Sequence, residues 1–172
     1  LQLVRYGKSV IRERMHFVER LNGILKDIHS SLTGGKEEIQ IIYEPNVSEE
    51  MFEEELARNR ERDLHFRQSC IGPHRDDFRV SVNGIDIRRF GSQGQQRTAA
   101  LSLKLAEIRL VEQEVKDTPV LMLDDVLSEL DSSRQNYLLQ SIHNIQTLIT
   151  CTGLDDFISN RFRINRVFQV SD

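Results

Sequence analysis

The sequence predicts a mixed α/β fold, and three observations support that expectation. Stretches with apolar residues at every third or fourth position, which indicate helices, alternate with short apolar runs, which indicate strands. The strands of the C-terminal part are continuous apolar runs, as is typical of a parallel sheet that is buried on both faces. The composition of the 172 residues, 38% hydrophobic and 29% charged, is that of a globular protein rather than a disordered one.

The first element expected is a long helix. Apolar residues from Val18 to Leu32 recur at helical spacing, and Gly34-Gly35 supplies the stop. A strand is expected next, over residues 38–43. Ser48 can then cap a second helix that runs through Leu56, because its hydroxyl can accept a hydrogen bond from a free N–H of the first turn. We interpret the alternating charges of that helix as a solvated face; a nucleic-acid-binding stripe is the alternative.

A β-hairpin is expected after the break at Gly72-Pro73. Residues 78–82 alternate like a half-buried strand, Asn83-Gly84 is a strong signal for a two-residue turn, and residues 85–87 are the returning strand. The polar stretch 91–96 follows and opens another helix.

The remaining elements alternate between helix and strand. The helix that starts after residue 96 continues through Val111, and an apolar strand is expected at 120–123. A helix near 134–142 and a strand at 147–150 come next, before an extended segment at 166–170. This order indicates strands that pair in parallel.

Charge, cysteines and hydropathy exclude several classes of protein. The net charge of −4 argues against a simple basic nucleic-acid binder, although a local basic patch remains an alternative. Two cysteines without metal-ligand spacing favour a reducing cytoplasm over a disulfide scaffold. No apolar run approaches the roughly 20 residues that cross a bilayer, so no membrane span is expected. The first residue is not methionine, and we expect further chain upstream.

The most informative strand ends in two carboxylates. Residues 120–123 are apolar and are followed by Asp124 and Asp125, which is typical of a Walker B strand. Such a strand delivers Asp124 to the carboxyl edge of a parallel sheet, where it can hold Mg²⁺ through water. Asp125 can orient or deprotonate an attacking water. The alternatives for both are a strand end with solvated acids and a helix cap.

A second informative segment opens the preceding helix. Gly91-Ser92-Gln93-Gly94-Gln95-Gln96-Arg97 places a hydroxyl and a glycine where a helix N-terminus offers unpaired N–H groups to an anion such as phosphate. An N-cap beside a flexible loop is the alternative. A third segment, Ser128-Glu129-Leu130-Asp131, is by itself only a helix-capping turn.

In this order, the three segments resemble the C-terminal half of an ATP-binding-cassette ATPase head. Ser92 and Gly94 to Arg97 match its signature motif, whereas Gln93 stands in place of the usual glycine and Gly91 in place of the usual leucine. Asp124-Asp125 matches Walker B, and 128–131 matches the D-loop.

A finer resemblance is to the RecF family of bacterial recombinational-repair ATPases, and it covers essentially the whole chain. The blocks that carry it are Gly72-Pro73-His74-Arg75-Asp76-Asp77-Phe78, Phe90-Gly91-Ser92-Gln93-Gly94-Gln95-Gln96-Arg97-Thr98 and Leu123-Asp124-Asp125-Val126-Leu127-Ser128-Glu129-Leu130-Asp131.

The resemblance implies an ATP-dependent homodimer that hydrolyses ATP slowly, binds DNA (single-stranded or gapped duplex) and supports RecA loading with RecO and RecR in the cytoplasm. It implies the cofactors ATP and Mg²⁺, with Asp124 as the metal ligand and Asp125 in the catalytic position. The nucleotide-binding residues it implies are Ser92, Gln93, Gly94, Gln95, Asp131 and Thr152. Asp125 stands where most relatives place a glutamate, and a displacement of about 1 Å can cost on the order of 100-fold in rate, which predicts slow hydrolysis.

The phosphate-binding loop of such ATPases is not found in this sequence. Gly7-Lys8-Ser9 lies in a helical stretch without the required first glycine, and Gly34-Gly35-Lys36 is followed by Glu37 at a helix stop. We therefore expect the loop in a preceding half, and expect this chain alone to be inactive. The histidine switch of the family is also not found; Thr152 is the candidate substitute.

The resemblance divides the chain into residues 1–72, the end of a helical lid arm, and 73–172, the C-terminal lobe of the head. For residues 72–77, an inter-lobe hinge or packing role and a dimer-interface role stay open. Arginines that could contact DNA phosphates, each with a solvated surface role as the alternative, are Arg88, Arg89, Arg161, Arg163 and Arg166. The alternative function is a non-catalytic partner-binding module that uses the nucleotide motifs only for dimer assembly.

Overall fold

The computed structural model describes residues 2–151 and 165–168. The chain forms two compact units, residues 1–99 and 100–172, which are described separately below. The predicted extended segment at 166–170 falls only partly within the described residues, and residues 165–168 have no regular secondary structure.

The first unit is organised around the long helix α1, Gln2–Thr33. Its buried positions, Gly7, Ile11, Leu21, Leu25 and His29, lie on the side that packs against the rest of the unit. The helix ends as expected: Gly34 and Gly35 have positive φ angles of 64° and 73°, and the Gly35 N–H donates to the Ser30 carbonyl at 2.8 Å. This backbone bond satisfies a carbonyl that has no partner at a helix C-terminus.

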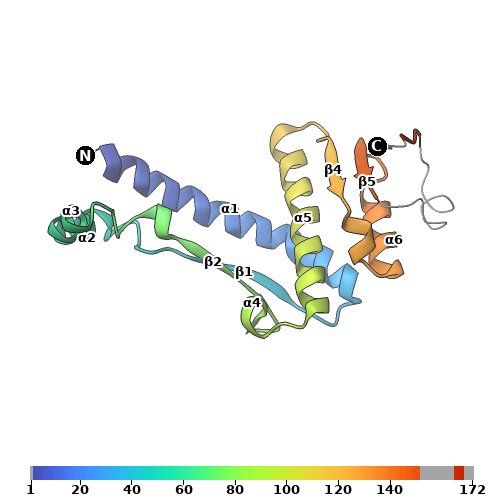
Figure 1. The fold of residues 1–172 in the computed structure, drawn as a ribbon, viewed down its shortest axis with the longest axis horizontal. Helices are drawn as coiled ribbons and strands as arrows, with labels where there is room; N and C mark the ends of the chain where they lie inside the picture. Colours follow the sequence, from blue (N-terminus) through green and yellow to red (C-terminus); the bar gives the residue numbers. More distant parts are fainter. Residues whose placement is uncertain (1, 152–164, 169–172) are drawn as a thin grey trace, which may run out of the picture. The chain divides into compact units, whose positions relative to one another are not determined.

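A three-stranded antiparallel sheet has the order β1-β2-β3, and β1 packs on α1; Figure 1 shows β1 and β2 running beside that helix. Its strands are β1 (Ile39–Glu44), β2 (Asp77–Val82) and β3 (Ile85–Asp86). Asn83 and Gly84 link β2 to β3 with φ angles of 51° and 78°, which confirms the predicted two-residue turn. The side chain of Asn22 on α1 bonds the backbone of Ile41 in both directions, at 2.8 Å each, and so fixes the helix against β1.

Two short helices replace the single second helix that the sequence predicted. They are α2 (Phe52–Arg58) and α3 (Arg60–Phe66), and they meet at Asn59. The hydroxyl of Ser48 accepts a hydrogen bond from the Met51 N–H at 3.4 Å, so the predicted capping bond forms in the turn before α2. Phe52 is 1% exposed and packs against Ile11 and Val47.

The connection from the sheet to the next long helix also differs from prediction. A 3₁₀ turn, η1 (Pro73–Arg75), precedes β2. The strand expected over 85–87 ends at Asp86, whose carboxylate accepts from the Arg88 N–H at 2.9 Å and caps a short helix, α4 (Ile87–Phe90). Helix α5 (Gln93–Val115) starts after Gly91 and Ser92, so most of the polar stretch expected before the helix forms its first turn.

The second unit contains the rest of α5 and a parallel pair of strands, β4 (Leu121–Asp124) and β5 (Thr147–Thr150). The turn η2 (Val126–Glu129) and helix α6 (Ser132–Ser141) connect the strands. The parallel pairing is as predicted, but burial on both faces is not seen within the described residues. Val120, Met122 and Leu148 are 57%, 77% and 53% exposed.

Among the helices of the described residues, none combines the length and the apolar character that a bilayer crossing requires.

Candidate functional site

The signature turn, residues 91–96, is built on a reciprocal cap at the start of α5. The Ser92 hydroxyl accepts from the Gln95 N–H at 3.2 Å, and the Gln95 side-chain oxygen accepts from the Ser92 N–H at 3.1 Å. This is a capping box, in which the side chain of each residue accepts a hydrogen bond from the other residue's N–H group, which has no partner within the helix. The Ser92 hydroxyl also donates to the same Gln95 oxygen at 3.3 Å. The cap places Ser92, Gln93 and Gly94 at the exposed start of the helix.

The two glycines of the turn differ in the space that a side chain would have. A Cβ on Gly91 would lie 2.6 Å from the Ile87 carbonyl oxygen, so the chain's own packing requires glycine there. A Cβ on Gly94 would meet only the Ser92 hydroxyl, at an ordinary contact distance of 3.9 Å. Within the chain, nothing near Gly94 excludes a side chain, although glycine weakens a helix.

Side chains around the turn hold it in place. Gln96 donates to the Ile87 carbonyl at 2.9 Å, and Thr98, 1% exposed, donates to the Gly94 carbonyl at 2.7 Å. The amide of Gln95 donates to Glu37 at 3.0 Å, and Glu37 approaches the buried His29 at 3.4 Å. Burial lowers the pKa of His29, and the nearby Glu37 carboxylate opposes that shift.

The second group of predicted residues lies at the carboxyl end of β4. Asp124 pairs with Thr150 of β5 in the parallel register, and its carboxylate accepts a hydrogen bond from the Thr150 hydroxyl. Asp124 is exposed, so it can be reached by a ligand at this edge. A carboxylate and a hydroxyl are oxygen donors of the kind that Mg²⁺ prefers, and Mg²⁺ commonly keeps several of its waters. Among the described residues, no group of three or more His, Cys, Asp or Glu side chains is placed to hold a metal ion.

Asp125 leaves the strand with a left-handed backbone, at φ 49° and ψ 20°. Its N–H donates to both the carbonyl and the hydroxyl of Thr150, each at 3.2 Å. Aspartate tolerates this conformation better than most residues. Asp124 therefore ends the strand, and Asp125 is the N-cap residue of η2.

Asp131 caps helix α6. Its carboxylate accepts from the N–H groups of Ser133 and Arg134 at 3.1 and 3.0 Å, and it pairs with the Arg134 guanidinium. The backbone bond from Arg134 is the largest cause of the lowered pKa of Asp131. The capping interpretation of this segment is therefore confirmed, and its nucleotide role stays a prediction. Thr152 lies outside the described residues.

The two groups of site residues belong to different compact units: the signature turn to residues 1–99, and Asp124, Asp125 and Asp131 to residues 100–172. The division at residue 72, between arm and head, stays a prediction; by contacts, β2 and β3 belong with β1.

Gly7 lies within α1, where a Cβ would clash with the Phe52 ring at 2.3 Å. Packing therefore explains this glycine without a phosphate loop.

The segment 72–77 contains a buried carboxylate, Asp76, with a side chain that is 2% exposed. It accepts from the Tyr43 hydroxyl, from the Asn46 N–H at 2.9 Å, and from Arg14 on α1 at 2.8 Å. Desolvation and the bond to Asp76 raise the pKa of Tyr43 to about 12. These contacts support the packing role for this segment.

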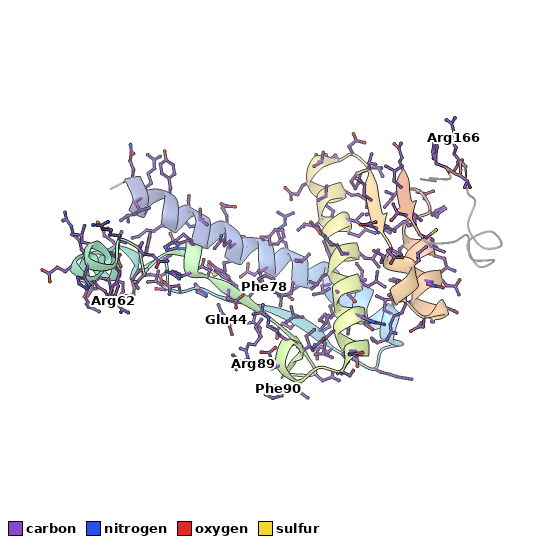
Figure 2. All side chains as sticks on the ribbon, viewed as in Figure 1. Glu44, Arg62, Phe78, Arg89, Phe90 and Arg166 are labelled. Carbon is purple, nitrogen blue, oxygen red and sulfur yellow. The ribbon has the colours of Figure 1, made fainter. Side chains whose placement is uncertain are left out.

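Of the arginines proposed for DNA contact, Arg88, Arg89 and Arg166 are described and exposed, and the first two have acidic neighbours. Arg88 pairs with Asp77 at 3.0 Å, and Arg89 lies 3.8 Å from Asp86. Arg89 and Phe90 project outward from α4, and Phe90 is 76% exposed (Figure 2). The guanidinium of Arg166 lies over the Phe168 ring, 5.1 Å from its centre. Arg161 and Arg163 lie outside the described residues.

Sequence reasoning missed three residues that support the site: Glu37, Asp76 as a structural hub, and Thr150. Glu37 follows Gly34-Gly35-Lys36, a segment that does not match the phosphate-binding loop. Thr150 ends its strand in register with Asp124, a signal that the prediction of parallel strands could have supplied.

Comparisons with known proteins identify what the chain resembles. No family model matches it. It is 57% identical over 170 residues to the DNA replication and repair protein RecF of Agathobacter rectalis, covering 99% of this chain and 47% of that protein. It is 56% identical over 172 residues to the same protein of Lachnospira eligens, again covering 47% of the relative. The chain thus spans about half the length of the curated relatives it matches.

Solved structures give the same result. The chain superposes with a TM-score of 0.79 and 36% identity on the recombination mediator protein RecF-ATP in the RecFOR pathway, over 90% of this chain and 44% of that one. The corresponding RecF-ATPrS structure gives a TM-score of 0.78. These similarities confirm the predicted α/β fold class and the predicted resemblance to RecF.

Proposed function

Because the chain resembles RecF over nearly its whole length, we propose that it is the C-terminal half of a RecF-type DNA-repair ATPase. In the complete protein it would supply the signature, Walker B and D-loop groups of an ATP site. Two solved relatives are described as RecF with ATP and with an ATP analogue, which supports ATP as the nucleotide.

The signature turn is the part of this proposal that the geometry supports best. Ser92, Gln93 and Gly94 are exposed at the first turn of α5, whose N–H groups have no partners in the helix itself. Such a turn can receive the γ-phosphate of a nucleotide held by a second copy of the protein. Close approach of that phosphate to the backbone would require glycine at position 94, whereas the packing within this chain does not require it.

The Walker B edge would supply the chemistry. Asp124, oriented by the Thr150 hydroxyl, would hold the waters of Mg²⁺, and the ion would neutralise charge on the phosphates. Asp125 would accept a proton from, or orient, the attacking water. Asp131 would lie at the interface between the two copies, and Thr152 would sense the γ-phosphate.

In this proposal the protein acts in the cytoplasm as an ATP-dependent homodimer that binds single-stranded or gapped DNA. The RecFOR pathway named for the solved relatives supports RecO and RecR as partners, with RecA loaded as the result. The exposed side of the β4–β5 pair, with Met122 and Leu148, would be covered by the half that carries the phosphate loop.

The exposed signature turn, capped by Ser92 and open at Gly94, is the observation that carries the proposal. The test uses the full-length protein that contains this chain, with analytical ultracentrifugation to measure ATP-driven association and phosphate release to measure turnover. Asp125→Ala should lower turnover and leave ATP binding and association largely intact. An equal loss of binding and turnover would contradict the role of Asp125.

A second measurement asks whether this chain binds ATP without the other half of the protein. The isolated chain should show no tight ATP binding, because the phosphate loop is expected elsewhere. Tight binding by this chain alone would refute that expectation. Association of the full-length protein with ATP but without any turnover would favour the alternative function, a partner-binding module that uses nucleotide only for assembly.

A further inference from the structure

The side chain of Gln95 connects the signature turn to the segment before β1. Its oxygen accepts from the Ser92 N–H at 3.1 Å and from the Ser92 hydroxyl at 3.3 Å, while its nitrogen donates to Glu37 at 3.0 Å. An ionised carboxylate can only accept hydrogen bonds, so the NH₂ end of the amide must face Glu37. The oxygen end must therefore face Ser92. The Glu37 carboxylate and the Ser92 N–H thus require the same orientation of the Gln95 amide.

Glu37 is itself held in place by the fold. It follows the glycine stop of α1 and precedes β1, and its side chain is 22% exposed. Its second oxygen lies 3.4 Å from Nε2 of His29, which is 0% exposed on the last turns of α1. The carboxylate therefore has one oxygen toward the long helix and the other toward the signature turn.

We propose that Glu37 is a positioning residue of the nucleotide site: its carboxylate orients Gln95, which in turn holds Ser92 and keeps the signature turn in its capped form. The inference rests on the proposed function, in which the N–H groups of this turn meet a phosphate. With Glu37 in place, the turn is already in its capped form when the nucleotide arrives, and little ordering remains to be done on binding. Through His29, the same contact ties the signature turn to α1.

The first test needs no nucleotide. Amide hydrogen exchange of residues 92–96 is compared between the unmodified full-length protein and Glu37→Ala. Loss of the Gln95 anchor should speed exchange there by about 10-fold, the worth of one hydrogen bond to a charged group, while the amides of β1 and β2 stay unchanged. Unchanged exchange at 92–96 would overturn the proposal, whatever the protein does with ATP.

The chain offers a matched control and a conservative variant. Glu38 is the next residue, carries the same charge, is 70% exposed at its side chain and pairs with Lys26 at 3.3 Å. Glu38→Ala should leave exchange at 92–96 and ATP-driven association unchanged. Glu37→Gln keeps an oxygen that can accept from Gln95 and should restore most of the protection. Equal effects of the Glu37 and Glu38 alanine variants would point to general charge and overturn the proposal.

The second test asks whether Glu37 acts through Gln95. Glu37→Ala should weaken ATP-driven association on the order of 10-fold in the unmodified background. In a Gln95→Ala background the same change should alter association by less than about twofold, because the contact is already lost. Additive losses would overturn the proposed route. If the unmodified protein does not associate with ATP at all, the proposed function fails, and the exchange experiment still decides the role of Glu37.

Discussion

Replacing Gly94 with alanine separates a role in the chain's own packing from a role toward a ligand outside it. Gly94 lies in the first turn of α5, and a Cβ there would meet only the Ser92 hydroxyl, at 3.9 Å. The change is therefore harmless within the chain and places a methyl group on the surface where a phosphate is proposed to bind.

The substitution is expected to raise the stability of the protein and to weaken its ATP-driven association. Alanine in place of a helical glycine stabilises a protein by about 0.5–1 kcal/mol, so the melting temperature should not fall. Crowding of a closely packed contact costs about 1–3 kcal/mol. Applied to ATP-driven association, this corresponds to a loss on the order of 10- to 100-fold.

Two measurements on the full-length protein check the prediction: thermal unfolding without nucleotide, and sedimentation velocity as ATP is added. Gly91→Ala is the matched control, because a Cβ there would lie 2.6 Å from the Ile87 carbonyl oxygen and 2.8 Å from the Ile87 Cβ. That variant should lose about 1–3 kcal/mol of stability with no nucleotide present. A Gly94→Ala protein that associates with ATP as well as the unmodified protein would refute the reasoning.

Two further predictions concern stability. Asp131→Ala removes the cap of α6 and should cost about 1 kcal/mol at neutral pH, as measured by urea unfolding. Because its hydrogen bonds lower the pKa of Asp131, this stabilisation is present above the carboxyl's unfolded pKa and is lost as the pH falls through the folded value, so the variant and the unmodified protein should converge in acid. Tyr43→Phe removes the hydroxyl that donates to buried Asp76 and should cost about 1–2 kcal/mol at neutral pH. The pKa of Tyr43 is raised to about 12, so this contribution is complete below the unfolded pKa near 10 and disappears as the pH rises through about 12; urea midpoints that stay apart beyond that pH would contradict it.

Local signals predicted most of the fold. The stop at Gly34-Gly35, the turn at Asn83-Gly84 and the parallel strands β4 and β5 all form as expected. The predicted single helix after Ser48 was wrong in detail because the chain breaks at Asn59, whose side chain bonds the Glu55 carbonyl at 2.9 Å. Helical periodicity does not reveal such a competing side-chain bond.

Several contacts of the site join residues far apart in the sequence, and local patterns do not predict them. The Ser92–Gln95 cap and the Asp131 cap join residues three apart or fewer, and their residue types alone indicate them. The bond from Gln95 to Glu37 spans 58 positions, and the bond from Thr150 to Asp124 spans 26. No local pattern distinguishes Glu37 from the equally acidic Glu38.

By itself, therefore, the sequence determined the helices, the turns, the order of the motifs and the resemblance to RecF, because each depends on residues close together in the chain. Only the tertiary structure decided that Glu37 anchors the signature turn, that Thr150 orients Asp124 and that Asp76 joins α1 to β1. Those partners meet because strand pairing and the packing of α1 on β1 bring distant backbone segments together. A hydrogen bond needs its donor and acceptor within about 3 Å, and at such separations in sequence only the folded chain supplies that proximity.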